Sequence, residues 1–254
     1  MSEQNLHQAS EEWIDAINAK KGYQAIDPTH FKRFVHNMRT YVFFRRMLKY
    51  IQPGDTVLEA GCGWGLASFA LAERGIHATA VDISPQLIHD LKSLQTQLGG
   101  NFVSHLECVV GDIFHLPALG KKVEVVCSDG TYEHFLDAED RKKILQNFAD
   151  ILQQHGKCIV AVPNLHNPFF GTAVDQKMPA MHPFTLATLR SELEAGGFRI
   201  LETGYTFVNP GFEQWIRSRA LIIPVKMVNS VFRFLPRFVQ HFLAAHLYIV
   251  AEKA

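Results

Sequence analysis

Short apolar runs alternate with longer stretches of helical periodicity along most of this chain. The short runs are compatible with buried strands, and the stretches between them place apolar residues on one face of a helix. This alternation predicts an α/β domain. The expected strands cover residues 57–60, 76–81, about 103–110, 123–129, 157–162, 199–208 and 246–252.

Capping residues mark the ends of the expected helices. Ser84 is followed by Pro85, a pair typical of a helix N-terminus, and Gly99 ends that helical pattern. Asp137 and Thr185 are expected to cap the next two helices.

The most informative stretch lies between the first strand and its helix. Glu59 ends the apolar run, and glycines follow at 61, 63 and 65. Glycines allow a tight turn and let a ligand approach the backbone. The N–H groups of the turn and of the helix N-terminus suit a polar or anionic ligand group. The plain alternative is a structural turn, since short glycine motifs have false positives.

An acid at the end of the second strand strengthens the ligand interpretation. Asp82 lies 17 residues after Gly65, where a carboxylate can accept hydrogen bonds from both hydroxyls of a ribose. The spacing Gly-x-Gly-x-Gly differs from the dinucleotide fingerprint. Glu59 would repel a pyrophosphate but suits a sulfonium and an ammonium. These residues predict a nucleoside-containing cofactor.

At this point the chain resembles the Rossmann-like, S-adenosylmethionine-dependent methyltransferases over residues 50 to 205 and at its last few residues. The resemblance implies a seven-stranded, mostly parallel sheet with helices on both faces and an antiparallel last strand. It also implies Asp112 at the adenine amino group and Ile113 against the adenine ring. The full set of expected cofactor-binding residues is Glu59, Gly61, Gly63, Gly65, Asp82, Ile83, Asp112, Ile113, Ser128 and Asp129.

The composition narrows the class of protein. The 254 residues include 25 basic and 25 acidic side chains, and this balance argues against a dedicated nucleic-acid binder. The four cysteines form no Cys-x-x-Cys pair, and we interpret them as buried thiols in a reducing compartment. The polar N-terminus resembles no signal peptide, and no apolar stretch reaches the roughly 18 residues of a spanning helix. We therefore expect a cytoplasmic protein. The 13 histidines show no metal-binding spacing, so no metal is expected.

Two flanking segments leave alternatives open. Residues 1–50 are expected to form helices that pack on the sheet, close over the cofactor, or do both; residues 51–208 and 246–254 form the core. Residues 209–245 form a strongly apolar helical insertion with five basic residues and one acid, Glu213. A cap over an apolar substrate, a membrane contact and a homodimer contact all fit this pattern.

The expected reaction is displacement of a methyl group from sulfonium by an acceptor oxygen, nitrogen or carbon. Its rate depends mainly on alignment of the reacting atoms. A base assists when the acceptor must lose a proton. His134, beside Glu133, is the first candidate, and Asp129, His166 and His182 are others. The predicted function is methylation of a small or lipophilic molecule. A nicotinamide-dependent oxidoreductase and a non-catalytic S-adenosylmethionine-binding protein are the alternatives.

Overall fold

A computed structural model describes residues 27–38, 41–167, 180–206 and 234–254. The described strands form one seven-stranded sheet with the order β3-β2-β1-β4-β5-β7-β6. Strand β7 runs antiparallel to both of its neighbours, and the other described pairs are parallel. The predicted fold class is confirmed. The strands are β1 (Thr56–Ala60), β2 (His77–Asp82), β3 (Leu106–Val110), β4 (Val123–Asp129), β5 (Leu152–Pro163), β6 (Phe198–Thr206) and β7 (His246–Lys253).

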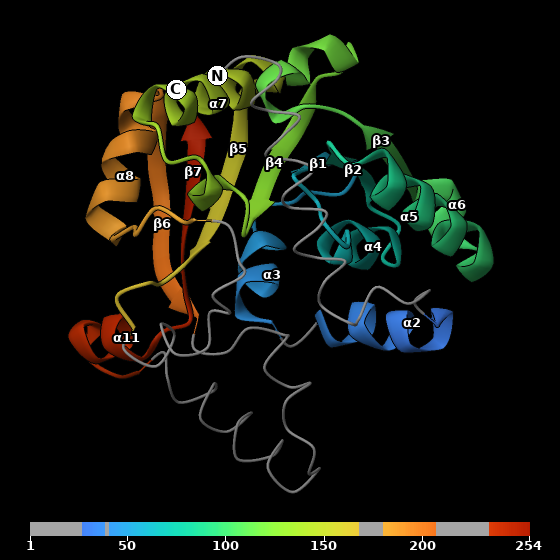
Figure 1. Cartoon of the computed structure of the whole chain (residues 1–254), viewed down its shortest axis with the longest axis horizontal. Coiled ribbons are helices and arrows are strands. Elements are labelled where there is room, and N and C mark those ends of the chain that lie inside the picture. The colour runs from blue at the N-terminus through green and yellow to red at the C-terminus, as the bar shows by residue number, and fades with distance from the viewer. Residues whose placement is uncertain (1–26, 39–40, 168–179, 207–233) are drawn as a thin grey trace, which may run out of the picture.

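Helices cover both faces of this sheet (Figure 1). The predicted caps are confirmed: Ser84 accepts a hydrogen bond from the backbone N–H of Leu87, and Asp137 and Thr185 cap their helices in the same way. The α-helices are α2 (Pro28–Asn37), α3 (Val42–Met47), α4 (Leu66–Ala72), α5 (Pro85–Leu98), α6 (Asn101–His105), α7 (Ala138–Ile151), α8 (Leu186–Ala195) and α11 (Arg237–Leu243), and the short 3-10 helices are η2 (Ile113–Leu119) and η3 (Tyr132–His134).

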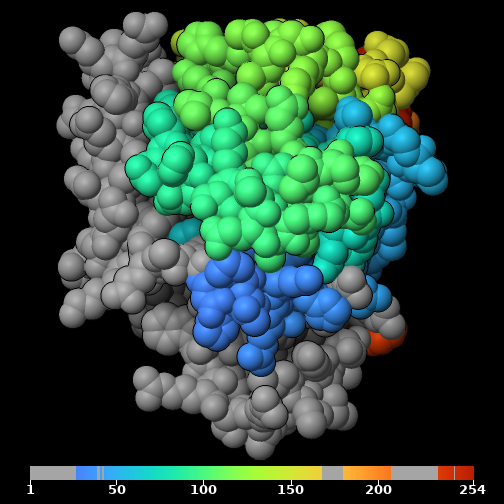
Figure 2. Space-filling model, turned by 90° about the vertical axis from the view of Figure 1, so that its right-hand side faces the viewer, coloured from blue at the N-terminus to red at the C-terminus, as the bar shows by residue number. Residues whose placement is uncertain are grey.

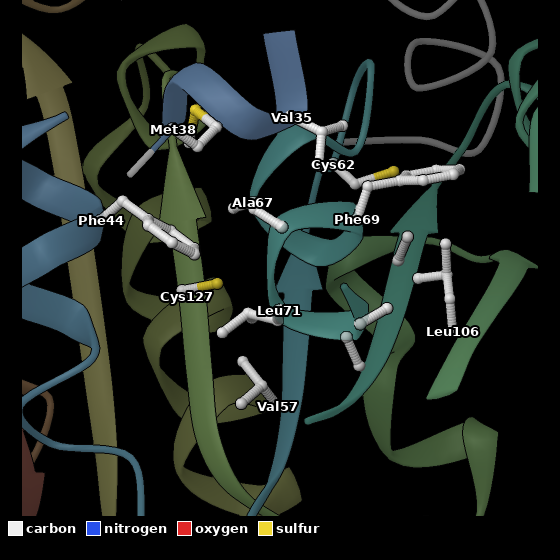
Figure 3. Packing of buried hydrophobic residues seen from close by; sticks show 14 of the residues in the cluster. Val35, Met38, Phe44, Val57, Cys62, Ala67, Phe69, Leu71, Leu106 and Cys127 are labelled. Carbon is white, nitrogen blue, oxygen red and sulfur yellow. The ribbon is translucent and has the colours of Figure 1, made fainter. Parts of the chain in front are cut away.

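Two apolar clusters lie on opposite faces of the sheet. Successive strand residues alternate between them, so that Val57 joins one cluster and Leu58 the other. The first cluster joins the sheet to α2, α3, α4 and α5, and Figure 3 shows part of it. The second joins the sheet to α7, α8 and η2. The central strands are buried on both sides, which explains their continuous apolar runs.

The helices before β1 are part of the core. Phe31 of α2 is buried and meets the ring of Phe69 edge-on, with centroids 4.8 Å apart. Phe43 and Phe44 of α3 are fully buried. Helix α2 also lies against α5, and Figure 2 shows it beneath the green surface of α5 and α6. These contacts support the packing interpretation of residues 28–47; the helix expected over residues 3–20 lies outside the described residues.

One expected strand was partly wrong. Residues 101–105 form α6, and β3 begins only at Leu106. Phe102 is buried there, and its ring centroid lies 5.7 Å from that of Phe69. Packing of this side chain beneath α4 accounts for a turn of helix where the apolar pattern predicted an extended chain.

Only the end of the 209–245 insertion is described, and it contains the short helix α11. All four cysteines are free and buried, as predicted. Among the described helices, none is long and apolar enough to cross a membrane.

Candidate active site

The glycine turn lies at the carboxyl end of β1 and depends on its glycines. Gly61, Gly63 and Gly65 have φ values of 67°, 48° and 62°, which residues with a Cβ rarely adopt. A Cβ on Gly61 would lie 2.3 Å from Cγ2 of Thr131. The Thr131 hydroxyl donates to the Gly61 carbonyl at 2.8 Å. The turn is thus held against the loop that follows β4.

Asp82 connects the glycine turn to the next helix. One carboxylate oxygen accepts from the N–H of Gly63 at 3.0 Å, and the other accepts from Ser84 at 3.0 Å. The side chain is buried, and burial raises the pKa of Asp82. The structure therefore places Asp82, the residue predicted to bind the ribose hydroxyls, beside the glycines. Ile83 is half-buried next to it.

Glu59 is buried beneath the turn and contacts α4. Its Oε2 accepts from the backbone N–H and the hydroxyl of Ser68, at 2.9 and 2.5 Å. Burial raises the pKa of Glu59 to about 7, and the charge of Asp82 contributes in the same direction. Glu59 therefore also fixes the start of α4 to the end of β1, a contact that the sequence did not predict.

Asp129 ends β4 and is hydrogen-bonded by Tyr41, which precedes α3. Burial raises the pKa of Asp129 to about 7, assisted by the nearby charge of Glu59. The adjacent Ser128 is fully buried, and its hydroxyl has no partner among the described residues. The N-terminal segment thus contributes a side chain at the carboxyl end of the sheet.

Glu133 and His134 lie together in η3, just beyond β4. Glu133 is 2% exposed, and burial raises its pKa to about 8. Its Oε2 has no hydrogen-bond partner in the described part of the chain. His134 Nε2 lies 3.8 Å from Glu133 Oε1, and burial lowers the pKa of the imidazole. This pair has the predicted location, with a neutral imidazole at neutral pH.

An internal ion pair fixes the loop that carries this pair. Arg141 of α7 is 4% exposed and donates to Glu192 of α8 at 2.8 to 3.0 Å. Its other amino group donates to the carbonyls of Phe135 and Leu136. The Tyr132 hydroxyl donates to Glu192 at 2.7 Å. Both ends of the loop are thereby fixed.

The two residues expected to bind adenine, Asp112 and Ile113, lie beside the end of β2. The N–H of Gly111 donates to the carbonyl of Asp82 at 2.9 Å. The next residue, Asp112, accepts from Phe114 and pairs with the ring of His115 at 2.9 Å. Ile113 is 8% exposed. The predicted positions are therefore brought to one edge, where Asp112 also caps η2.

The two remaining histidine candidates separate. His182 donates its backbone N–H to the Glu133 carbonyl at 2.7 Å, so it lies next to η3. His166 is exposed and stacks near His241 of α11, with ring centroids 5.7 Å apart. The structure therefore groups His182 with Glu133 and His134, and His166 with the insertion.

This edge of the sheet fits a ligand with cationic groups. Glu59 and Glu133 are buried and Asp129 is half-buried, and among the described residues no lysine or arginine forms an ion pair with them. Buried carboxylates are costly unless a cation compensates them. A Cβ added at Gly63 would meet nothing within 4 Å, so the turn is open to a ligand. The donor set thus matches a ligand with a ribose and a positive charge.

Sequence reasoning missed the residues that support this site. Ser68, Thr131 and Tyr41 each bond to a predicted site residue. Thr131 could have been found, since it follows Gly130 at the expected strand end. Tyr41 gave no local signal because its partner Asp129 is 88 residues away.

A separate surface cavity of about 460 Å³ lies at the opposite edge of the sheet. Its lining includes Thr56, His77 and Val123, which begin β1, β2 and β4. Ligands of open α/β sheets bind outside the carboxyl ends of the strands, so this cavity is distinct from the candidate site.

Comparison with known proteins decides the family. A model described as a methyltransferase domain matches residues 57–156. A ubiquinone biosynthesis O-methyltransferase of Coxiella burnetii (strain CbuK_Q154) is 30% identical over 173 residues, which cover 61% of this chain and 70% of that protein. The chain belongs to the S-adenosylmethionine-dependent methyltransferases. The predicted family and cofactor are confirmed, and the nicotinamide alternative has no support.

One further relative of this methyltransferase matches over a short stretch, and two solved structures below 25% identity show the fold alone. The magnesium-protoporphyrin O-methyltransferase of Rhodobacter capsulatus is 47% identical over 77 residues, which cover 30% of this chain and only 32% of that protein. The structure of a SAM-dependent methyltransferase from Archaeoglobus fulgidus has a TM-score of 0.58 at 23% identity, covering 83% of this chain and 91% of the other. Magnesium protoporphyrin IX methyltransferase from Synechocystis PCC 6803 with bound SAH gives 0.58 at 19% identity, covering 95% and 94%.

Proposed function

We propose that this protein transfers a methyl group from S-adenosylmethionine to an oxygen of a small, lipophilic acceptor. The observation that supports the proposal is the group of poorly solvated carboxyls with raised pKa values, Glu59, Asp129 and Glu133, near the carboxyl ends of β1 and β4 and beside the open glycine turn. Two relatives are named as O-methyltransferases, one of magnesium-protoporphyrin and one in ubiquinone biosynthesis, and these names favour oxygen as the acceptor atom. The apolar segment 209–245 is compatible with such a substrate.

Each part of the site has a proposed task toward the cofactor. Glu59 and Asp129 face the cationic groups, and Asp82 holds the ribose hydroxyls. Asp112 and Ile113 hold the adenine from the neighbouring strand end. Backbone groups of Gly61, Gly63 and Gly65 line the same side, with Ile83 and Ser128 adjacent. The bound cofactor supplies a sulfonium-activated methyl group.

The protein's own contribution to the acceptor lies in η3. His134 is neutral near pH 7 because burial lowers its pKa, so it can accept the proton of an acceptor hydroxyl. Burial raises the pKa of Glu133 to about 8, so it is mostly protonated near pH 7. It can therefore orient the imidazole or the acceptor as a hydrogen-bond donor. Arg141 and Glu192 act through the loop as positioning residues.

The proposal is tested by titration calorimetry and a methyl-transfer assay. We expect S-adenosylhomocysteine to bind and NAD to give no heat. We then expect transfer from labelled S-adenosylmethionine to an alkylated catechol, reduced strongly by His134→Ala with little change in cofactor affinity. An Arg190→Gln control, in an exposed pair on α8, should be unaffected. Transfer only to amine acceptors, or equal rates for wild type and His134→Ala, would contradict the assignment of oxygen and base.

We further propose that the protein is cytoplasmic. The four buried, unpaired thiols support a reducing compartment. Retention of the protein in the soluble cytosolic fraction at high salt, with all four thiols titratable after unfolding, is the expected result. Recovery of disulfide-linked protein from an oxidising compartment would contradict it.

A further inference from the structure

Three phenylalanines are exposed around helix α11. Phe234, Phe238 and Phe242 are 73%, 77% and 53% exposed. Phe238 and Phe242 are four residues apart on α11 and therefore lie on one side of this helix, and Phe234 lies just before it. We call these three residues the aromatic stripe. The other large apolar side chains that are exposed in the described ranges, Val103, Val110 and Leu136, are isolated aliphatic residues on other elements.

The protein holds the end of α11 firmly by its other side. Asn164, which follows β5, is fully buried and donates to the carbonyls of His241 and Ala244 at 2.6 and 3.1 Å. Asn167 donates to Ala244 at 2.9 Å, and the Tyr205 hydroxyl bonds the ring of His241 at 3.1 Å. These polar contacts fix the helix to the sheet and leave Phe238 and Phe242 facing solvent.

We propose that the aromatic stripe docks the enzyme onto an anionic lipid surface. In the described part of the insertion, residues 234–245, Arg237 is exposed and there is no aspartate or glutamate. Residues 209–233 lie outside the described residues, and their sequence adds four cations and one acid, although the whole chain has no net charge. A basic, aromatic segment of this kind binds where anionic headgroups meet the acyl region. The cations are Arg217, Arg219, Lys226, Arg233 and Arg237, and the acid is Glu213.

Charge and orientation favour a membrane over the other two occupants. A symmetric contact with a second copy through α11 would bring the exposed Arg237 of the two copies together. A cap over the acceptor would turn its aromatic side chains toward the protein, whereas Phe238 is 77% exposed. Anionic lipid complements both the cations and the aromatic side chains.

The stripe also has a useful location. Helix α11 lies at the end of the molecule toward which β6 points (Figure 1). Asn164, the residue after β5, donates a hydrogen bond to α11. Strand β5 pairs with β4, which ends at Asp129. A lipid surface at α11 would therefore lie near the cofactor edge, where an apolar acceptor could pass from the bilayer. This docking does not depend on which acceptor atom is methylated.

Vesicle sedimentation of the full-length protein tests the proposal. The vesicles are phosphatidylcholine alone and an equal mixture with phosphatidylglycerol. We expect wild type to bind the anionic vesicles and to dissociate at high salt, because the cations are screened. Phe238→Ser with Phe242→Ser should reduce binding about tenfold, since each removes apolar area from the contact. Val103→Ser, the matched control on α6, should bind like wild type.

Two further measurements keep the test decisive. Unchanged thermal stability and S-adenosylhomocysteine affinity show that the double variant is folded. Fluorescence of Phe238→Trp should shift to the blue and be quenched by brominated lipid. The proposal is overturned if wild type ignores anionic vesicles, if the double variant binds equally, or if Phe238 and Phe242 prove to control dimerisation in light scattering without affecting lipid binding. Failure of methyl transfer to any oxygen acceptor leaves this result unaffected.

Discussion

Carboxyl groups in two regions of the sheet have opposite surroundings. At the carboxyl ends of β1 and β4, Glu59 is buried and Asp129 is half-buried, and neither has a lysine or arginine ion pair in the described part of the chain; desolvation raises both pKa values to about 7. On β7, the partners of Glu252 are Lys157 and Arg199 at 2.7 and 2.6 Å, which lower its pKa to about 2. The carboxyls of the first region have no positively charged partner among the described residues, whereas Glu252 has two.

This difference distinguishes carboxyls that stabilise the fold from carboxyls that we expect to bind a ligand. Ion pairs such as Arg141 with Glu192 stabilise the folded chain by themselves. The carboxyls near the glycine turn have a desolvation cost that hydrogen bonds from Ser68 and Tyr41 offset only in part. A cationic ligand would offset it, and binding would then stabilise the fold. Perturbed carboxyls in this setting are a signature of a functional site.

The largest expected effect is on the complete network at Arg141. Arg141→Met leaves the Glu192 carboxylate without its cation, and we expect a loss of about 3–5 kcal/mol in the free energy of unfolding. Urea denaturation measures this change. The control Arg190→Gln breaks an exposed i,i+4 pair and should cost about 0.5 kcal/mol or less. Equal losses in the two variants would remove the distinction between them.

The next effect concerns the turn at Gly61. Gly61→Ala combines a positive φ with a clash against Thr131, and we expect a loss of about 2–4 kcal/mol together with weaker cofactor binding. Gly120→Ala is the matched control, since its φ is 64° and a Cβ there would meet nothing within 4 Å. It should lose only about 1–2 kcal/mol and bind the cofactor normally. Similar losses would show that backbone strain alone matters at Gly61.

Replacing one carboxyl in each region should change stability in opposite directions. Asp129→Asn removes a poorly solvated carboxyl with a raised pKa, so we expect the ligand-free protein to melt at a higher temperature. Its S-adenosylmethionine affinity should fall about tenfold, roughly 1.4 kcal/mol. Glu252→Gln should slightly lower the melting temperature and leave the affinity unchanged. A destabilised Asp129→Asn protein with normal affinity would contradict the assignment.

The smallest expected effect is a difference in pH dependence. Glu59, Asp129 and Glu133 have raised pKa values in the folded protein. Their contribution to the free energy of unfolding is therefore complete below about pH 4 and is lost as the pH rises through 7 to 8. Glu252 behaves oppositely, since its contribution is lost as the pH falls toward about 2. Ligand-free stability, measured by urea denaturation, should therefore decline between about pH 4 and pH 8. Asp129→Asn should flatten this decline, and an unchanged slope would argue against buried ionisation.

Local patterns predicted which strand ends carry the glycine turn and Asp82. The spacing of the glycines and Asp82 was sufficient because each lies at the carboxyl end of a strand, and parallel strands bring those ends together. The caps at Ser84 and Thr185 were also predictable, since a cap depends on residues within one helical turn.

Long-range partners could not be predicted in the same way. The bond of Tyr41 to Asp129 and that of Arg141 to Glu192 depend on how distant elements pack. Helix α6 over residues 101–105 was not predicted, because it depends on the packing of Phe102 against Phe69 of another helix. Local periodicity contains no information about either partner.

Proton release during cofactor binding tests the central claim most directly. Calorimetric titration with S-adenosylmethionine at about pH 6.5, in buffers with different ionisation enthalpies, counts the protons released. Because carboxyls with pKa values of about 7 are partly protonated there, the account predicts release of roughly half a proton or more per site, and less from Asp129→Asn. Binding with no proton release in either protein would contradict the claim that these carboxyls receive the cationic end of the cofactor.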